Sequence, residues 1–227
     1  MFDADITDLN SDDVAREQQV AGGMAQATRG LVDAVIRSTV SDQEMLAITA
    51  EIEKLTARLR VSQIPGSFGV KHTPDGTVRG YGNAVVGLRN AVAPPVKVLQ
   101  SPEGRAWADI HLGAAYEGPP GLVHGGVSAL VLDQVAGEAA AAGGTPGMTG
   151  TLTLRYRRGT PLGDLRVEAW TTGHEGYKTF ISGAISDAEG PTVECEGIFV
   201  LPAGPARAPS PRASNDPRNA GSSLTDL

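Results

Sequence analysis

The sequence predicts an α+β domain in which one antiparallel sheet packs against one buried helix. Three observations lead to this fold class. Residues 127–142 form an almost uncharged run, and a helix that is apolar on nearly every side is expected to be buried on nearly every side. Two strand-like segments precede this run. Four more follow it, separated by breaks short enough for antiparallel hairpins.

The chain before this domain has the pattern of two helices. A cap at Ser11-Asp12-Asp13 begins the first helix, and residues 1–10 before it are expected to be frayed. Its apolar positions recur at helical spacing: Val20, Met24, Ala27, Leu31 and Val35. A capping box with Ser41 at the cap and Glu44 three residues later begins the second. Its apolar stripe has steps of three and four: Met45, Ile48, Ile52, Leu55 and Leu59. We expect residues 1–62 to form a helical hairpin that packs on the core or on a partner subunit.

The remaining segments divide the chain further. Residues 63–93 are loop-like, with a small hairpin expected around the turn Pro74-Asp75-Gly76. Residues 94–202 form the sheet-and-helix domain. Its expected strands are 96–99 and 105–112 before the helix, then 148–157, 165–174, 177–187 and 191–201 as a meander after it. Residues 203–227 are rich in Pro, Ala, Ser, Gly and Asn, and we expect them to be disordered.

Composition excludes several classes of function. The 227 residues carry a formal charge of −7, which argues against nucleic acid as a partner. No apolar run is long enough to span a membrane. The single cysteine, Cys195, rules out an internal disulfide framework and fits a reducing, cytoplasmic location. It stands between Glu194 and Glu196, whose charges would raise the pKa of the thiol, so we interpret it as structural.

One carboxylate interrupts the apolar helix. The residues one turn from Asp133 on either side are Ala129, Leu130, Ala136 and Gly137, and none of them can pair with it. A solvated surface aspartate is the ordinary interpretation of such a residue. A carboxylate on an apolar or small face is also a common mark of a functional site, and we favour that interpretation.

The start of the same helix is a second candidate. The first turn of a helix carries backbone N–H groups without internal partners, together with positive potential from the peptide dipoles. Gly125 and Gly126 have no side chain to keep a ligand away, so a carbonyl oxygen that gains negative charge could be held there. The alternative is that His124-Gly125-Gly126 only permits a tight entry into a buried helix. No residue stands at metal-ligand spacing from His124, so we predict no metal, and no nucleotide-binding glycine motif predicts a cofactor.

The two candidates cannot act together within one chain. Gly125 and Asp133 are eight residues apart, so about 12 Å of helix separates them. They can act on one carbonyl if a second copy of the helix lies antiparallel beside the first, as a twofold dimer would place it. The sequence therefore predicts a site shared between subunits.

The stretch from Tyr116 to Gly126 resembles a known family. Gly118-Pro119-Pro120-Gly121, then His124-Gly125-Gly126 and Asp133, is similar to the PaaI-like group of hotdog-fold acyl-CoA thioesterases, which includes the mammalian thioesterase superfamily members. The resemblance covers about residues 94–202. It implies a hotdog fold, with an antiparallel sheet wrapped around one long central helix, and a homodimer or a dimer of dimers (a homotetramer).

The resemblance also implies roles for individual residues. Asp133 would be the base or nucleophile, Gly125 would supply the N–H that polarises the thioester carbonyl, and Thr149 would position the water. His124 and Gly126 belong to the same helix entrance and are included in the candidate site. Some members add an Asn to the oxyanion hole at the position of Gly118 in this chain. Basic residues at matching places contact CoA, and they correspond here to Arg155, Arg157 and Lys178; an ordinary solvated sheet face is the alternative for each.

The sequence thus predicts the hydrolysis of an acyl-CoA thioester to a carboxylic acid and CoA, with no cofactor. Two alternatives remain open. One is a non-catalytic acyl-CoA-binding or assembly protein of the same fold, in which the helical hairpin mediates assembly. The other is an acyl-CoA hydratase or dehydratase, which would use a catalytic His with an acid, a pattern that His124 lacks. For the hairpin, a lid over the acyl channel is the alternative to packing.

Overall fold

The computed structural model describes residues 5–74, 76 and 78–201. The first part of the chain contains, in order, β1 (Asp5–Ile6), α1 (Ser11–Arg37), α2 (Asp42–Arg60), β2 (Lys71–His72) and β3 (Val78–Arg79). The second part contains β4 (Leu99–Ser101), β5 (Arg105–Leu112), the 3-10 turn η1 (Ala114–Tyr116), α3 (Gly125–Ala142), β6 (Met148–Tyr156), β7 (Gly163–Glu175), β8 (Lys178–Asp187) and β9 (Gly190–Val200). The expected disordered tail, 203–227, lies outside the described residues.

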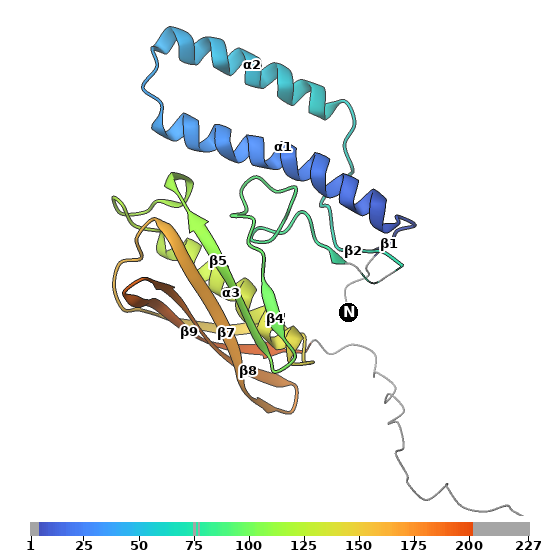
Figure 1. Cartoon of the computed structure of the whole chain (residues 1–227), viewed down its shortest axis with the longest axis vertical. Helices are drawn as coiled ribbons and strands as arrows, with labels where there is room; N and C mark the ends of the chain where they lie inside the picture. Colours follow the sequence, from blue (N-terminus) through green and yellow to red (C-terminus); the bar gives the residue numbers. More distant parts are fainter. Residues whose placement is uncertain (1–4, 75, 77, 202–227) are drawn as a thin grey trace, which may run out of the picture.

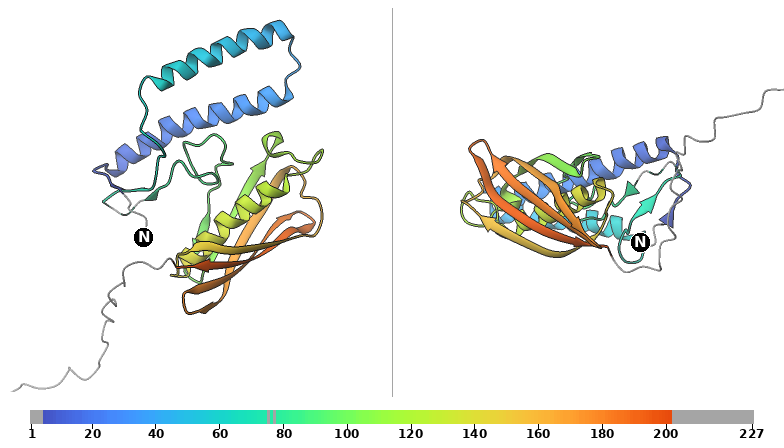
Figure 2. Two further views of the ribbon diagram at one scale, coloured as in Figure 1. Left: turned by 180° about the vertical axis from the view of Figure 1, so that it is seen from behind. Right: turned by 90° about the horizontal axis from the view of Figure 1, so that it is seen from below.

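A six-stranded antiparallel sheet forms the second part, in the order β4-β5-β7-β8-β9-β6. Helix α3 contacts all six strands, and Figures 1 and 2 show it lying along the concave side of the curved sheet. The core lies between these two layers. Its largest fully buried side chains include Val131, Leu132 and Val135 from α3 and Leu112, Val167, Ile185, Val193 and Phe199 from the sheet. This arrangement confirms the predicted α+β class and the hotdog fold.

The order of the last four strands differs from the prediction. β7, β8 and β9 form the expected meander, but β6 pairs with β9 and lies at the edge of the sheet. The connection from β6 to β7 is therefore a crossover. Thr160 within it is buried, and its Oγ1 lies 2.9 Å from Oγ1 of Thr192 on β9. This contact holds the β6–β7 connection against β9 at the end of the sheet. The connection is short, but it does not form the predicted hairpin turn.

Two smaller expectations also need correction. The opening strand is Leu99–Ser101 and not residues 96–99, although 105–112 is a strand as predicted. Within the stretch expected to be frayed, Asp5–Ile6 form a strand that pairs parallel with β2. The predicted small hairpin is present, because β2 pairs antiparallel with β3.

The N-terminal helices form the expected hairpin, but they pack unequally. The cap of α1 is Asn10, one residue before the predicted Ser11-Asp12-Asp13, and it exchanges hydrogen bonds with Asp13. Ser41 caps α2 as predicted by accepting from Glu44 N–H, but the return bond of the predicted capping box is not among the bonds of the described residues. α1 is held to the following loop region by Arg29, whose guanidinium donates to the carbonyl oxygens of Ala93 and Asn90. α2 runs antiparallel alongside α1 (Figures 1 and 2). All of α2 is described, and none of its residues is buried.

Candidate active site

The entrance to α3 leaves one backbone donor free. His124 is the N-cap, and its Nδ1 accepts the N–H of Gly126 at 3.0 Å. The N–H groups of Val127 and Ser128 both donate to the His124 carbonyl oxygen. Within residues 5–74, 76 and 78–201, the N–H of Gly125 has no hydrogen-bond partner. His124 therefore caps the helix, and Gly125 offers the donor that an oxyanion would need.

A tyrosine that the sequence did not single out holds Gly125 in place. The hydroxyl of Tyr156, at the end of β6, donates to the Gly125 carbonyl oxygen at 2.9 Å. A Cβ at Gly125 would lie 3.3 Å from the Tyr156 ring, so only glycine fits there without moving the tyrosine. Strand alternation could have found this residue, because Leu152 and Leu154 pack against the core from β6 and Tyr156 is the next residue at the same two-residue spacing.

The backbone of His124 lies so close to Gly118 that only glycine fits at this position. An added Cβ would lie only 2.7 Å from the Cα of His124. The loop is held in this close approach by two backbone bonds, from Gly118 N–H to the Leu122 oxygen and from His124 N–H to the Tyr116 oxygen, both 2.9 Å. The asparagine that some family members place here has no room for its side chain, so the backbone alone would form the oxyanion hole.

Asp133 and Thr149 meet directly. Thr149 Oγ1 donates to Asp133 Oδ1 at 2.7 Å, across from β6 to α3. The register between β6 and β9 shifts between Thr149 and Thr151, and such a bulge can re-aim a side chain. Gly150 sits in the bulge, where a Cβ would lie 2.9 Å from Val200 Cγ2. The structure thus brings together the predicted carboxylate and the predicted hydroxyl.

Asp133 is half-buried, and its negative charge affects the thiol of Cys195 on the inner face of the sheet. Burial raises the pKa of the Cys195 thiol to about 11, with the negative charges of Asp133 and Glu196 contributing in the same direction. A thiol with so high a pKa is protonated and unreactive at neutral pH. Cys195 is buried, as expected for a structural residue.

One chain contains two separated half-sites. Gly125 with Tyr156 lies at one end of β6, and Asp133 with Thr149 lies at the other. Gly125 and Asp133 are eight residues apart on α3, which corresponds to about 12 Å of helix. The free N–H and the carboxylate therefore do not act on one carbonyl within a single chain.

The three predicted basic residues lie on the other face of the sheet. Arg155 is paired in register with Glu194, whose neighbour Cys195 faces the core, so alternation places Arg155 on the face away from α3. Arg157 is engaged there, because its Nε donates to Glu194 at 2.7 Å. Lys178 is at the opposite end, with its Nζ 5.9 Å from the Tyr177 ring centroid. The structure does not bring these three residues together.

The described residues supply the groups for an acid–base reaction at a carbonyl. They are a half-buried carboxylate, a hydroxyl bonded to it, and a free backbone N–H at a helix start. No cluster of three or more His, Cys, Asp or Glu side chains in the described ranges could hold a metal ion. None of the described helices is long and apolar enough to cross a membrane.

Comparison with known proteins finds one family. The thioesterase superfamily profile matches residues 120–194. A crystal structure of a thioesterase superfamily protein is 34% identical with a TM-score of 0.71, covering 79% of this chain and 90% of that chain. A phenylacetic acid degradation-related protein from Ralstonia eutropha JMP134 is 20% identical, covering 48% and 86%, with a TM-score of 0.44. A Streptococcus mutans UA159 protein bound to acetyl-CoA is 15% identical, covering 47% and 88%, with a TM-score of 0.44.

Proposed function

Because this chain belongs to the thioesterase superfamily, we propose that it hydrolyses an acyl-CoA thioester to a carboxylic acid and free CoA. The observation that carries the proposal is the pair of half-sites. At one end of α3 the N–H of Gly125 has no partner among the described residues, and the same helix carries Asp133 bonded to Thr149. These are the hydrogen-bond donor for a developing oxyanion and the base that hydrolysis requires.

The reaction runs between two subunits. The thioester oxygen docks on the Gly125 N–H of one subunit, while Asp133 of the other removes a proton from a water that Thr149 orients. The water oxygen bonds to the carbonyl carbon, and the negative charge on the thioester oxygen is stabilised by the N–H. The C–S bond then breaks, and the CoA sulfur takes the proton. Direct attack by Asp133 on the carbonyl carbon is the second route, with water cleaving the resulting anhydride.

Two uncovered surfaces support a twofold partner. Small or apolar side chains beside Asp133 line the open stripe of α3, where Leu130 is 40% exposed. β6 is an edge strand of nine residues, and an unprotected edge of that length is a template for pairing with another chain. A second copy that pairs along β6 in the antiparallel sense would lay its α3 beside the first. Gly125 of one copy would then approach Asp133 of the other.

The same arrangement gives the basic residues a role. Arg155 and Lys178 are at opposite ends of the outer face of one chain. Antiparallel pairing along β6 would bring Arg155 of one subunit to the end where Lys178 of the other lies. We assign Arg155, Arg157 and Lys178 to the CoA phosphates or pantetheine on this basis, with Arg157 first having to leave Glu194.

Substitution of Asp133 tests the proposal. Asp133→Asn and Asp133→Ala should lower kcat by about 10²- to 10⁴-fold, the usual contribution of a positioned general base, in an assay of free thiol released from a panel of acyl-CoAs. Glu138→Gln is the matched control, since Glu138 is a carboxylate on the same helix that bonds Gln134 and Gln100, and its kcat should be unchanged. Acyl-CoA binding by the wild-type chain without thiol release would contradict the proposal.

A further inference from the structure

The apolar stripe of α1 is not the face that packs. The packed face carries Val14 and Ala25, which are buried, and Gly22 beside Leu88. The stripe marked by the sequence lies elsewhere around the helix, with Val20 66%, Met24 54% and Val35 50% exposed. Burying these side chains would stabilise the chain by about 25 cal/mol per Å² of apolar surface. In a single subunit the stripe remains open.

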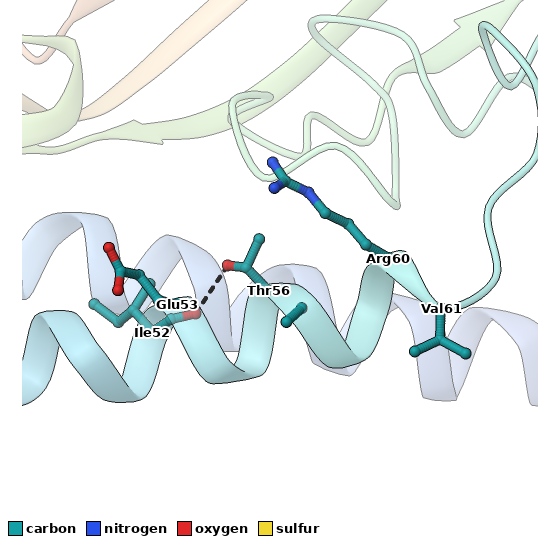
Figure 3. A pocket seen from close by; sticks show the side chains of 6 residues that line it. Ile52, Glu53, Thr56, Arg60 and Val61 are labelled. Atoms are coloured by element: carbon teal, nitrogen blue, oxygen red, sulfur yellow. Dashed lines mark hydrogen bonds between the residues drawn. The ribbon is translucent and has the colours of Figure 1, made fainter.

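The end of the α2 stripe is open as well. Leu55 and Leu59 are 52% and 58% exposed, whereas Met45, Ile48 and Ile52 on the same stripe are half-buried. The connection from α1 to α2 is extended at both Ser38 and Ser41. Four extended residues reach up to about 13 Å, and the axes of packed helices are about 8–10 Å apart. The connection is therefore long enough for α2 to lie farther from α1 than a tightly packed helix would. Figure 3 shows the side of α2 where Ile52, Thr56 and Arg60 line a hollow of about 750 Å³ that continues into open solvent.

The exposed side chains of the two stripes form a large apolar surface. Those that are at least 36% exposed are Val20, Met24, Leu31 and Val35 on α1 and Leu55 and Leu59 on α2. Together they expose on the order of 500 Å², a large part of the roughly 800 Å² that one partner contributes to a standard interface. An exposed apolar patch of this size is often a binding surface.

The charges of α2 match a second copy of the same helix. Its first turn carries the acidic residues Asp42 and Glu44, and its last turn carries the basic residues Arg58 and Arg60. Two copies related by a twofold axis perpendicular to the helix run antiparallel, so the acidic first turn of each faces the basic last turn of the other. The stripe of Met45, Ile48, Ile52, Leu55 and Leu59 has the 3–4 spacing of a coiled-coil seam.

We propose that the α1–α2 hairpin is a self-association surface, against which the hairpin of a second copy packs to form a four-helix bundle. The hairpin packs on the segment before β4, at one edge of the sheet, whereas β6 is at the other edge. The two surfaces are therefore separate, and their combined use joins four chains. The count of four chains rests on the proposed dimer through β6, whereas the packing of one hairpin on another does not depend on hydrolysis.

The mass of the full chain in solution tests the inference. Sedimentation equilibrium should give four chains for the wild type and two for Leu55→Glu/Leu59→Glu, which puts charges into the bundle. Ala50→Glu is the matched control, because it adds a charge to α2 about 140° around the helix from Leu55, and it should remain a tetramer. The dimer formed by Leu55→Glu/Leu59→Glu should keep its thioesterase activity, because α3 and β6 are unchanged.

Hydrogen exchange on the wild-type chain gives a second measurement that does not depend on how a variant folds. The α2 amides should be protected above the concentration at which tetramers dissociate and exchange faster below it. Equal masses for the wild type and Leu55→Glu/Leu59→Glu, or α2 exchange that is independent of concentration, would overturn the proposal. Co-sedimentation of the wild type with lipid vesicles at an unchanged dimer mass would also overturn it and assign the face to a membrane surface.

Discussion

At the residue scale, the N–H of Gly125 can be removed without breaking the helix it begins. Gly125 is the first residue of α3, a position where proline is favoured. His124 has φ −60° and ψ 131°, which suits a residue that precedes proline. Gly125→Pro should lower kcat by about 10²- to 10³-fold, the cost of one oxyanion donor.

The control for this change is Gly125→Ala, which keeps the N–H and adds the same Cβ near the Tyr156 ring at 3.3 Å. If the N–H is the catalytic group, the alanine variant should retain most of the activity lost in the proline variant. Equal losses in both, measured by thiol release, would mean that crowding of Tyr156 is the cause and that the N–H is not used.

Gly118, in the loop that leads into α3, should be required for the stability of the folded protein. Gly118→Ala places a Cβ 2.7 Å from the Cα of His124, and this overpacking should cost about 1–3 kcal/mol in the free energy of unfolding. Gly23→Ala on α1, where an added Cβ meets nothing within 4 Å, should instead stabilise by about 0.5–1 kcal/mol. Urea unfolding of both variants checks the opposite signs.

Individual residues could be predicted from sequence only where the signal was local or came from the family. Asp133 was identified because its neighbours one turn away cannot pair with a carboxylate, and the family motif supplied Thr149. Tyr156 was missed, because its contact with Gly125 joins residues that are 31 positions apart. The ion pair of Arg157 with Glu194 was missed for the same reason, since the register of β6 against β9 cannot be read from either strand.

At the scale of elements, one ion pair ties the crossover after β6 to the turn between β8 and β9. Arg158 bonds both carboxylate oxygens of Asp187 and donates to the Gly190 carbonyl oxygen at 3.0 Å. The hydrogen bond from Arg158 is the main reason that the pKa of Asp187 falls from its ordinary value of 3.8 to about 2. The folded state therefore binds the proton more weakly than the unfolded state.

This linkage has a definite sign. A carboxylate whose pKa is lowered on folding contributes stability that is present above pH 4 and is lost as the pH falls towards 2. Asp187→Asn should lower the Tm at pH 6 and reduce the further loss of Tm between pH 4 and pH 2. Asp164→Asn is the control, because Asp164 is an exposed residue that pairs with His111. A wild-type Tm that falls no more steeply than that of Asp187→Asn below pH 4 would contradict the assignment.

The elements themselves followed from local patterns, but their order did not. α3 ends where Gly143-Gly144 predicts, and β5 has its predicted bounds because Ala106, Ala108, Ile110 and Leu112 alternate inward. Turn length alone cannot distinguish a hairpin from a crossover, so the place of β6 beside β9 was not predicted. The amphipathic patterns of α1 and α2 gave the helices but not their partners, because a stripe shows which face is apolar and not what covers it.

At the scale of the whole molecule, a shared site predicts complementation between two inactive variants. In a dimer of Asp133→Asn with Gly125→Pro, one site has both groups intact and the other has neither. Random reassociation of equal amounts makes half of the dimers mixed, so about a quarter of wild-type activity should return. Asp133→Asn mixed with Asp133→Ala is the control and should remain inactive. No recovery from a mixture shown to exchange subunits would mean that the site is not shared.

The edge position of β6 also has a consequence for the order in which the chain folds. β6 is synthesised before β7 and β8, yet its only neighbour in the described sheet is β9, where Met148 lies opposite Val200. β6 therefore cannot pair with its neighbouring strand until the eleven residues of β9 have left the ribosome. Until then no neighbouring strand holds Thr149 near Asp133. We expect the nascent chain to acquire its helix and central strands first and its reactive centre last.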